Sequence, residues 1–287
     1  MDTVALLSVP YFLAREREGM GAGPDAILEG GLVPRLAELG WRVSTREIRL
    51  TRSGLADAGA VAELNASLAE AVRDAIGAGQ FPLVLAGGCN ASLGCLAGLG
   101  DRAMATLWFD AHGDFNTPET SPSGFLDGMC LAIAAGRCHQ DLRERVGLQA
   151  IQGGRIVHAG GRDFDPQERE ALLSAGAVVI SPEQLCTPNA IAPVFGAIGK
   201  QAEGLYAHVD LDVLDGRRCP VNEFQPHGGL SLDALLAAIR IGARSIRLRA
   251  AAITAYNPDC DAERRSIDAA IQVAETICGS ARRPPSG

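Results

Sequence analysis

Two short runs of aspartate and histidine carry residue types that bind metal ions. Asp110, His112 and Asp114 occupy alternate positions in the first run, and Asp210 and Asp212 do so in the second. Because alternate side chains of an extended strand point to one face, each run is expected to gather its oxygen and nitrogen donors. Carboxylates held so close together would repel one another unless cations neutralised them. The spacing therefore predicts a metal site.

The donor types indicate which ion and which reaction this site serves. Four carboxylates with a single imidazole suit a hard or borderline ion such as Mn(II) better than an ion that prefers thiolates. Two ions that share bridging carboxylates can ionise a water near neutral pH, so hydrolysis is the expected reaction. Either run alone would more often be structural, since short motifs occur by chance. Together the two runs favour metal binding.

The elements that must position these runs follow an alternating pattern. Short apolar runs alternate with longer amphipathic stretches, as strands and helices do. Strands are expected near 4–9, 41–48, 81–88, 105–114, 155–163, 177–183, 204–215 and 245–258, with helical patterns at 23–40, 61–79, 166–176 and 231–242. This order predicts the α/β class, as a doubly wound, mostly parallel sheet with helices on both faces. In such sheets, ligands bind at the carboxyl ends of the strands, where both runs lie.

The chain is expected to form one domain. No repeat or polar linker divides it, so residues 1–280 should fold together, with a disordered tail at 281–287. Two loops, at 116–128 and 216–229, are long for a compact α/β domain. Long loops in such domains are usually functional.

Composition excludes several classes of partner. A net charge of −8 provides no basic surface for nucleic acid or for an anionic membrane, whereas a cationic small molecule would be attracted. The sequence contains no apolar run of membrane-spanning length and no secretory signal pattern, so a cytoplasmic location is expected. The eight cysteines lie far apart without a C-x-x-C pair, which is typical of reduced thiols.

Two motifs resemble those of a known superfamily. The segments 110–116 (DAHGDFN) and 210–215 (DLDVLD) resemble motifs of the arginase, agmatinase and formimidoylglutamase superfamily. Weaker matches in the same order occur at Gly87 and Gly88, Ser123, Asp163, Gly228 and Pro258. The resemblance spans nearly the whole chain. It implies hydrolysis of guanidino or amidino carbon–nitrogen bonds with two manganese ions, an arginase-like sheet, and assembly into trimers or hexamers.

The resemblance also assigns roles to the metal-binding runs. It implies that Asp110 and Asp210 bridge both metals, and that Asp114 completes the first metal and orients the hydroxide. His112 and Asp212 would complete the second metal.

Three further positions match substrate contacts of the superfamily. Asn116 and Ser123 correspond to contacts with an amino-acid-like tail, and Asp163 corresponds to a contact with an α-amino group. The alternative is that all three are turn or capping residues, since Asn, Ser and Asp populate loops for local reasons.

The sequence departs from the superfamily at the first metal. The superfamily has G-G-D-H-S with a metal-binding histidine, whereas this chain has Gly87-Gly88-Cys89-Asn90-Ala91. The amide oxygen of Asn90 is a candidate ligand, although it binds more weakly than imidazole. Cys89 is a softer donor one residue away, and Asn90 could instead order the turn.

Two more departures affect catalysis and substrate recognition. Asp127 stands where the superfamily has a proton-shuttling histidine, so it is a candidate general acid, with a solvated loop aspartate as the alternative. Ala255 stands where a glutamate pairs with the guanidinium, so recognition of plain arginine in the usual way is not expected. His208 shares a strand face with Asp210 and is interpreted as a core or supporting histidine.

The favoured function is thus a two-metal hydrolase of a guanidine or amidine. The alternative is an arginase-like protein that has lost turnover and binds metal, ligand or an assembly partner. A third and weaker possibility is a deacylase related to histone deacetylases, which use one zinc ion.

Overall fold

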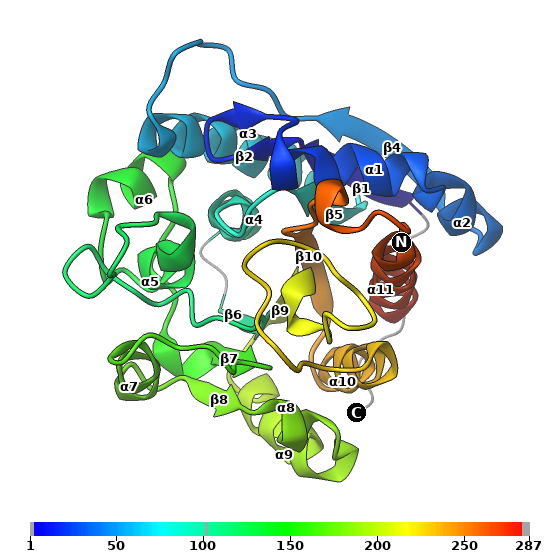
Figure 1. The fold of residues 1–287 in the computed structure, drawn as a ribbon. Helices are drawn as coiled ribbons and strands as arrows, with labels where there is room; N and C mark the ends of the chain where they lie inside the picture. Colours follow the sequence, from blue (N-terminus) through cyan, green and yellow to red (C-terminus); the bar gives the residue numbers. More distant parts are fainter. Residues whose placement is uncertain (1–2, 101–102, 283–287) are drawn as a thin grey trace.

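The computed structural model describes residues 3–100 and 103–282. Eight strands form one sheet in the order β4-β1-β5-β10-β9-β6-β7-β8, and every neighbouring pair is parallel (Figure 1). The strands are β1 (Thr3–Val9), β4 (Arg42–Glu47), β5 (Phe81–Ala86), β6 (Met104–Phe109), β7 (Ile156–Ala159), β8 (Val178–Ile180), β9 (Gly204–Asp210) and β10 (Leu248–Thr254). A separate hairpin pairs β2 (Tyr11–Phe12) with β3 (Arg15–Glu16). The predicted α/β class and parallel sheet are confirmed.

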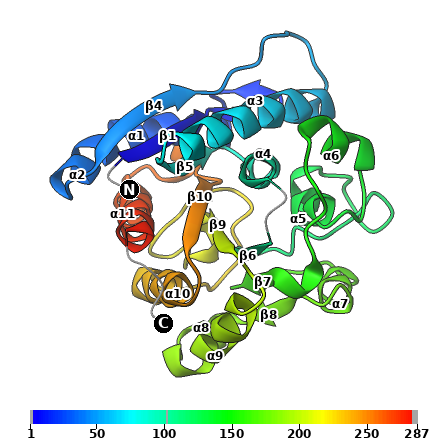
Figure 2. The same cartoon turned by 180° about the vertical axis from the view of Figure 1, so that it is seen from behind.

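Helices cover both faces of the sheet, as Figures 1 and 2 show from opposite sides. On one face lie α1 (Gly23–Glu29), α2 (Leu32–Glu38), α8 (Pro182–Leu185), α9 (Pro188–Gly199), α10 (Leu232–Ser245) and α11 (Arg265–Ala281). On the other lie α3 (Asp57–Gly77), α4 (Ala91–Leu99), α5 (Cys130–Ala134), α6 (Gln140–Val146) and α7 (Glu168–Ser174). The sheet thereby separates two hydrophobic cores.

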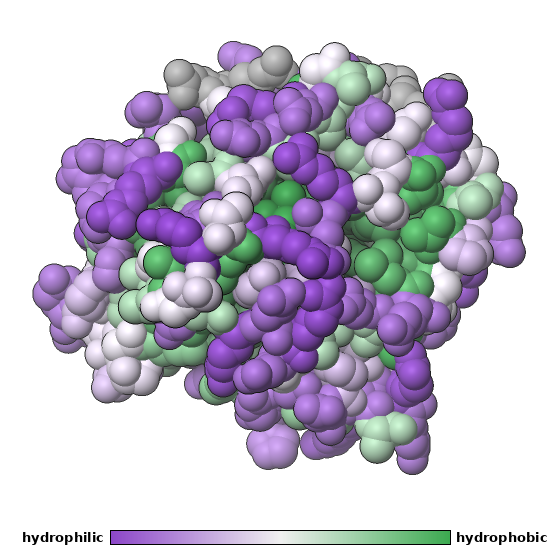
Figure 3. Space-filling model, turned by 90° about the horizontal axis from the view of Figure 1, so that it is seen from above, coloured by the Kyte–Doolittle hydropathy of each residue, from purple (hydrophilic) through white to green (hydrophobic). Residues whose placement is uncertain are grey.

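The interior strand β6 is a continuous apolar run because both of its faces are buried. Leu107 and Phe109 pack into one core, and Met104 and Trp108 pack into the other. Alternate side chains of a strand point to opposite faces, and both faces are covered here. Polar residues instead cover much of the outer surface, with apolar residues visible in recesses between them (Figure 3).

Two predicted element boundaries need correction. The helical pattern at 23–40 is divided into α1 and α2, because Gly31 has a φ of +100° that interrupts the helix. At the other end, Ala281 still belongs to α11, so the helix extends one residue into the predicted tail. The guanidinium of Arg282 donates hydrogen bonds to the carbonyls of Leu39 and Gly40, and residues 283–287 lie outside the described residues.

The strands that lead to the two aspartate runs end earlier than predicted. β6 ends at Phe109, so the first run lies in an irregular segment beyond the strand, and Asp114 has a φ of +51°. β9 ends at Asp210, and a short 3-10 helix, η4 (Leu211–Val213), carries Asp212. The donors therefore converge through turns after the strands rather than through strand alternation.

Among the described residues, no helix is both long and apolar enough to cross a membrane.

Candidate metal centre

A cavity of about 180 Å³ opens at the carboxyl ends of the central strands. Its wall includes both long loops predicted to be functional. It is lined by Met20, Cys89, His112, Asp114, Asn116, Ser121, Ser123, Phe125, Asp127, Gly128, Asp163, Asp165, Glu168, Asp210, Asp212, Asn222, Phe224 and Ala255. Because β5, β10, β9 and β6 are successive neighbours in the sheet, residues far apart in sequence meet here.

One group of donors joins the two metal-binding runs. Nδ1 of His112 lies 3.0 Å from Oδ2 of Asp212 and 3.5 Å from Oδ1 of Asp110. Backbone amides fix these carboxylates: Ala111 donates to Asp212 at 3.1 Å, and Asp212 donates to Asp210 at 2.8 Å. Ligand atoms of Asp110, His112 and Asp212 all lie within 4.8 Å of one another, which is close enough to share an ion.

The charges of this group perturb its pKa values. Burial would lower the pKa of His112, but hydrogen bonds with Asp110 and Asp212 outweigh it and raise that pKa to about 12. Burial would raise the pKa of Asp212, but the hydrogen bond and charge of His112 outweigh it and leave that pKa below its usual range. The carboxylates of Asp110 and Asp212 therefore favour a positive charge at this point of the site.

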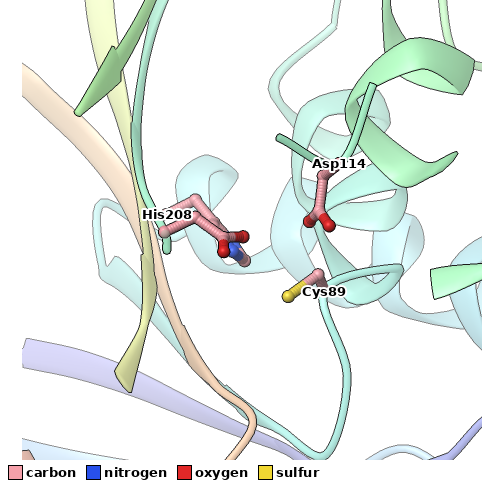
Figure 4. A group of neighbouring side chains, drawn as sticks. Cys89, Asp114 and His208 are labelled. Atoms are coloured by element: carbon pink, nitrogen blue, oxygen red, sulfur yellow. The ribbon is translucent and has the colours of Figure 1, made fainter. Parts of the chain in front are cut away.

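A second group of donors lies beside the first. Ligand atoms of Cys89, Asp110, Asp114 and His208 lie within 4.8 Å of one another, and all four residues are buried. Figure 4 shows the side chains of Cys89, Asp114 and His208 pointing toward a common space. The Cys89 thiol donates to Oδ2 of Asp210 at 3.0 Å, which places that carboxylate at the same point. The position of Cys89 in this group was left open by the sequence.

The buried carboxylates of this group resist ionisation. Burial raises the pKa of Asp114 well above its usual value, and the charge of Asp110 adds to the shift. Burial likewise raises the pKa of Asp210, with the charge of Asp212 as the second cause. Carboxylates in this condition are stabilised as anions by a bound cation. Together with the imidazoles and the thiol, they fit a site for divalent metal ions.

The side chain of Asn90 is bonded to Asp127 and does not line the main cavity. Its side-chain amide donates to Oδ1 of Asp127, and its own oxygen is buried without a hydrogen-bond partner in the described part of the chain. Asn90 borders a small separate space beside Tyr11 and Leu13, whereas Cys89 lines the main cavity. The turn after β5 therefore directs the cysteine, and not the asparagine, toward the other donors.

Asp127 is held firmly on the cavity wall. Its carboxylate accepts hydrogen bonds from the backbone amides of Cys89 at 3.2 Å and Asn90 at 3.0 Å. Burial raises its pKa to about 6, although these hydrogen bonds act in the opposite direction. Gly88 allows this contact, since a Cβ there would lie 2.8 Å from the Asp127 carboxylate. Asp127 is thus buried rather than a solvated loop aspartate.

The three residues matched to substrate contacts all line the cavity, but they differ in their bonding. The amide of Asn116 donates to Asp165 at 2.7 Å, and its oxygen accepts from Thr120 at 3.0 Å. The Ser123 hydroxyl accepts from the amide of Phe125 at 3.2 Å. The side chain of Asp163 is 63% exposed, with its carboxylate 3.9 Å from Nε2 of His112. Asp163 thus has the greatest freedom to meet a ligand.

Glu168 is a supporting residue that the sequence reasoning missed. Its carboxylate accepts hydrogen bonds from the amide of Phe115 at 2.8 Å and from Asn116 at 3.3 Å. A Cβ at Gly113 would lie 2.3 Å from the Glu168 side chain, so the glycine is required for this approach. The only signal in the sequence was an acidic residue in the first turn of a predicted helix, which is too common to identify it.

Ala255 and two aromatic side chains line another part of the cavity wall. Ala255 lies on the wall with a φ of +65°, and its carbonyl accepts from the amide of Asn222 at 2.8 Å. Phe125 and Phe224 also line the cavity, with ring centroids 5.6 Å apart, and Phe224 is 46% exposed. No sequence pattern identified this pair, because both rings come from irregular loops.

Comparisons with known proteins identify the family to which the sequence and the fold belong. The sequence pattern of the arginase family matches residues 2–279. An arginase of Brevibacillus brevis is 30% identical over 290 residues, covering 96% of this chain and 97% of that protein. The solved structure of an arginase from Bacillus subtilis superposes with a TM-score of 0.88 at 28% identity, covering 99% of both chains. A formimidoylglutamase of the same species shares the fold at 17% identity, with a TM-score of 0.78, 100% of this chain and 89% of that one. The chain belongs to the arginase family.

Proposed function

We propose that this protein hydrolyses a guanidino or amidino carbon–nitrogen bond with the help of two divalent metal ions. One observation carries the proposal: four buried aspartates from two chain segments meet His112 at the floor of a cavity, in a chain of the arginase family. Ions bound there would supply Lewis acidity and hydroxide near neutral pH, and the oxygen-rich donors favour Mn(II).

Different residues of the protein are proposed to bind the ions and to transfer the proton. Asp110 belongs to both donor groups, and Asp210 accepts hydrogen bonds from Cys89 of one group and from the backbone of Asp212 in the other, so both carboxylates are suited to contact both ions. Asp114 would bind the first ion and orient the attacking oxygen, and His112 would bind the second with Asp212. The carboxyl group of Asp127 lies on the wall and is the group that we assign to proton transfer to the leaving nitrogen.

The walls of the cavity favour a cationic, planar substrate group. Besides the proposed metal-binding aspartates, Asp163 and Asp165 also line the cavity. Phe125 and Phe224 present aromatic rings, over which an amidinium or guanidinium can stack. Ala255 provides no anion, so the substrate is proposed to be recognised by these groups rather than by a buried carboxylate at that position.

The direct test is hydrolysis by the purified, metal-loaded protein. A panel of guanidines and amidines, including arginine, agmatine and formimidoyl compounds, would be incubated with manganese-loaded protein. Release of urea or formamide is expected, and Asp110→Asn should abolish it. Full metal loading without any product from the panel would contradict catalysis and would favour a protein that binds metal or ligand without turnover.

A further inference from the structure

The first metal position of this chain has an unusual donor set. We propose that the first ion is held by the thiolate of Cys89 and by Nε2 of His208, together with the carboxylates of Asp110 and Asp114. The inference rests on the proposed metal-dependent function and refines it. It makes the first position a mixed sulfur, nitrogen and oxygen site, in contrast to the oxygen-rich second position.

The four donors lie close together in the structure. One ligand atom from each of Cys89, Asp110, Asp114 and His208 lies within 4.8 Å of the others. His208 is fully buried, and Cys89 is 4% exposed. Figure 4 shows Cys89 and Asp114 directed toward the space in front of His208. An ion in this space would contact all four residues at once.

His208 has a nitrogen that no protein group satisfies. Its Nε2 atom is buried and has no hydrogen-bond partner among the described residues, whereas Nδ1 lies 2.8 Å from the hydroxyl of Ser92. A buried ring nitrogen without a partner costs free energy, on the order of 1–3 kcal/mol for an unsatisfied polar group. A metal ion accepts this lone pair and removes the cost.

Neighbouring groups orient the His208 ring so that Nε2 can bind a metal ion. Ser92 accepts a hydrogen bond from the hydroxyl of Tyr206 at 2.8 Å and can also accept one from Nδ1–H, which leaves Nε2 as the free lone pair. The ring stacks on Trp108 at 3.7 Å between centroids. The indole of Trp108 also donates to Asp110 at 3.1 Å. Outer groups that fix a ligating histidine in this way are usual at metal sites.

Asn90 does not compete for the same place. Its amide is bonded to Asp127, and it borders the small space on the other side of the turn. Cys89 instead meets Asp210 through its sulfur. A divalent ion bound here would replace the thiol proton of Cys89, which would pass to solvent. The hydrogen bond from the thiol to Asp210 would then be absent, and that carboxylate would be available to the ion.

This donor set changes the expected metal preference. Thiolate and imidazole ligands favour Zn(II), Co(II) or Fe(II) over Mn(II), whereas the oxygen donors beside Asp212 still suit Mn(II). The first position is therefore expected to bind zinc more tightly than manganese.

The test is X-ray absorption spectroscopy of the zinc-loaded full chain. Wild-type protein should show a sulfur shell at about 2.3 Å around zinc, the usual zinc–thiolate distance. Cys89→Ser should abolish this shell and weaken zinc binding by at least about 10-fold, the lower limit for loss of a supporting group. His208→Gln should reduce the imidazole scattering and retain the sulfur shell.

Matched variants identify the sulfur that binds. Cys130 is also buried and donates to Asp114 at 3.1 Å, so Cys130→Ser is the control that should retain the sulfur shell. Asn90→Ala should retain it as well. Two zinc ions per chain without a sulfur shell, or a shell lost only in Cys130→Ser, would overturn the inference and leave the proposed function intact. Absence of zinc and manganese binding altogether would overturn both.

Discussion

Oε1 of Glu168 accepts a hydrogen bond from the backbone amide of Phe115 at 2.8 Å. Through this contact, helix α7 holds the irregular segment that carries Asp110, His112 and Asp114. The second oxygen of Glu168 accepts from the amide of Asp165 at 3.2 Å, so one buried carboxylate joins the segment after β6 to the loop after β7. The amides of Phe115 and Asp165 lie outside the sheet, so Glu168 accepts the hydrogen bonds that a neighbouring strand would otherwise accept.

Glu168→Ala is expected to destabilise the protein through these two amides. The free energy of unfolding should fall by about 1–3 kcal/mol, because the amide of Phe115 would be left buried without a partner. Urea denaturation measures the change. The matched control is Glu170→Ala on the exposed side of the same helix, which should change the value by less than about 0.5 kcal/mol. Equal effects of the two variants would contradict the role of Glu168.

Removal of metal is expected to lower thermal stability. The charge of Asp110 disfavours the anionic forms of Asp114 and Asp210 without a cation, whereas an ion that binds only the folded chain stabilises it. At a hundredfold excess over the dissociation constant, one ion contributes about 2.7 kcal/mol. Melting of chelated and manganese-reloaded protein, followed by circular dichroism, measures this gain.

The gain from manganese should also depend on pH. Protons compete with metal for Asp114 and Asp210, whose pKa values are raised by burial, so both carboxyl groups must lose protons when the ion binds. The stabilisation should be full at alkaline pH and be lost as pH falls through those raised pKa values. A gain that is the same at pH 8 and pH 5.5 would show that the ion binds elsewhere.

Asp127 and Asp163 are expected to affect different kinetic constants. Asp127→Asn should lower kcat by about 10²–10⁴-fold if its carboxyl group transfers a proton to the leaving nitrogen. Asp163→Asn should mainly raise KM, because its exposed carboxylate lies at the cavity wall, where a substrate can contact it. Steady-state kinetics with the best substrate of the panel separates the two effects. An unchanged kcat in Asp127→Asn would remove it from the mechanism.

Ala255→Glu is expected to shift substrate preference toward simple guanidines. A carboxylate at this wall position would pair with a guanidinium inside a partly desolvated cavity, where charge-assisted hydrogen bonds are strong. The ratio of kcat/KM for arginine or agmatine to that for the best wild-type substrate should rise by about tenfold, equivalent to about 1.4 kcal/mol. Ala255→Gln has nearly the same size without the charge and is the control. A similar rise in both variants would assign the effect to shape.

The sequence predicted the sheet and the proximity of the aspartates because both depend on patterns that local structure preserves. A continuous apolar run such as β6 indicates a strand covered on both faces, and acidic residues at strand ends indicate a ligand site. Asp110 and Asp212 do lie on either side of His112, but not through the strand alternation that the sequence suggested. Their carboxylates meet through turns, where backbone amides such as that of Ala111 hold them.

The choice between Cys89 and Asn90 could not be made from the sequence. The two residues are adjacent in a turn, and the direction of each side chain depends on how β5 meets α4. That geometry is set by tertiary contacts, including the anchor that Asp127 provides to both backbone amides. His208 was ambiguous for a similar reason, because its face of the strand packs on Trp108 and also borders the donor group.

The strand order of the sheet determines when the two halves of the site can meet during folding. β5 and β6 follow one another in sequence, yet β10 and β9 lie between them in the sheet. Cys89 and Asp110 therefore reach their final separation only after β10 has been synthesised and inserted. Such long-range strand pairing is slow, since distant segments must find one another before the contacts form. A nascent chain that ends before residue 248 would lack the strand that joins the two halves, so capture of metal at the first position would report completed folding.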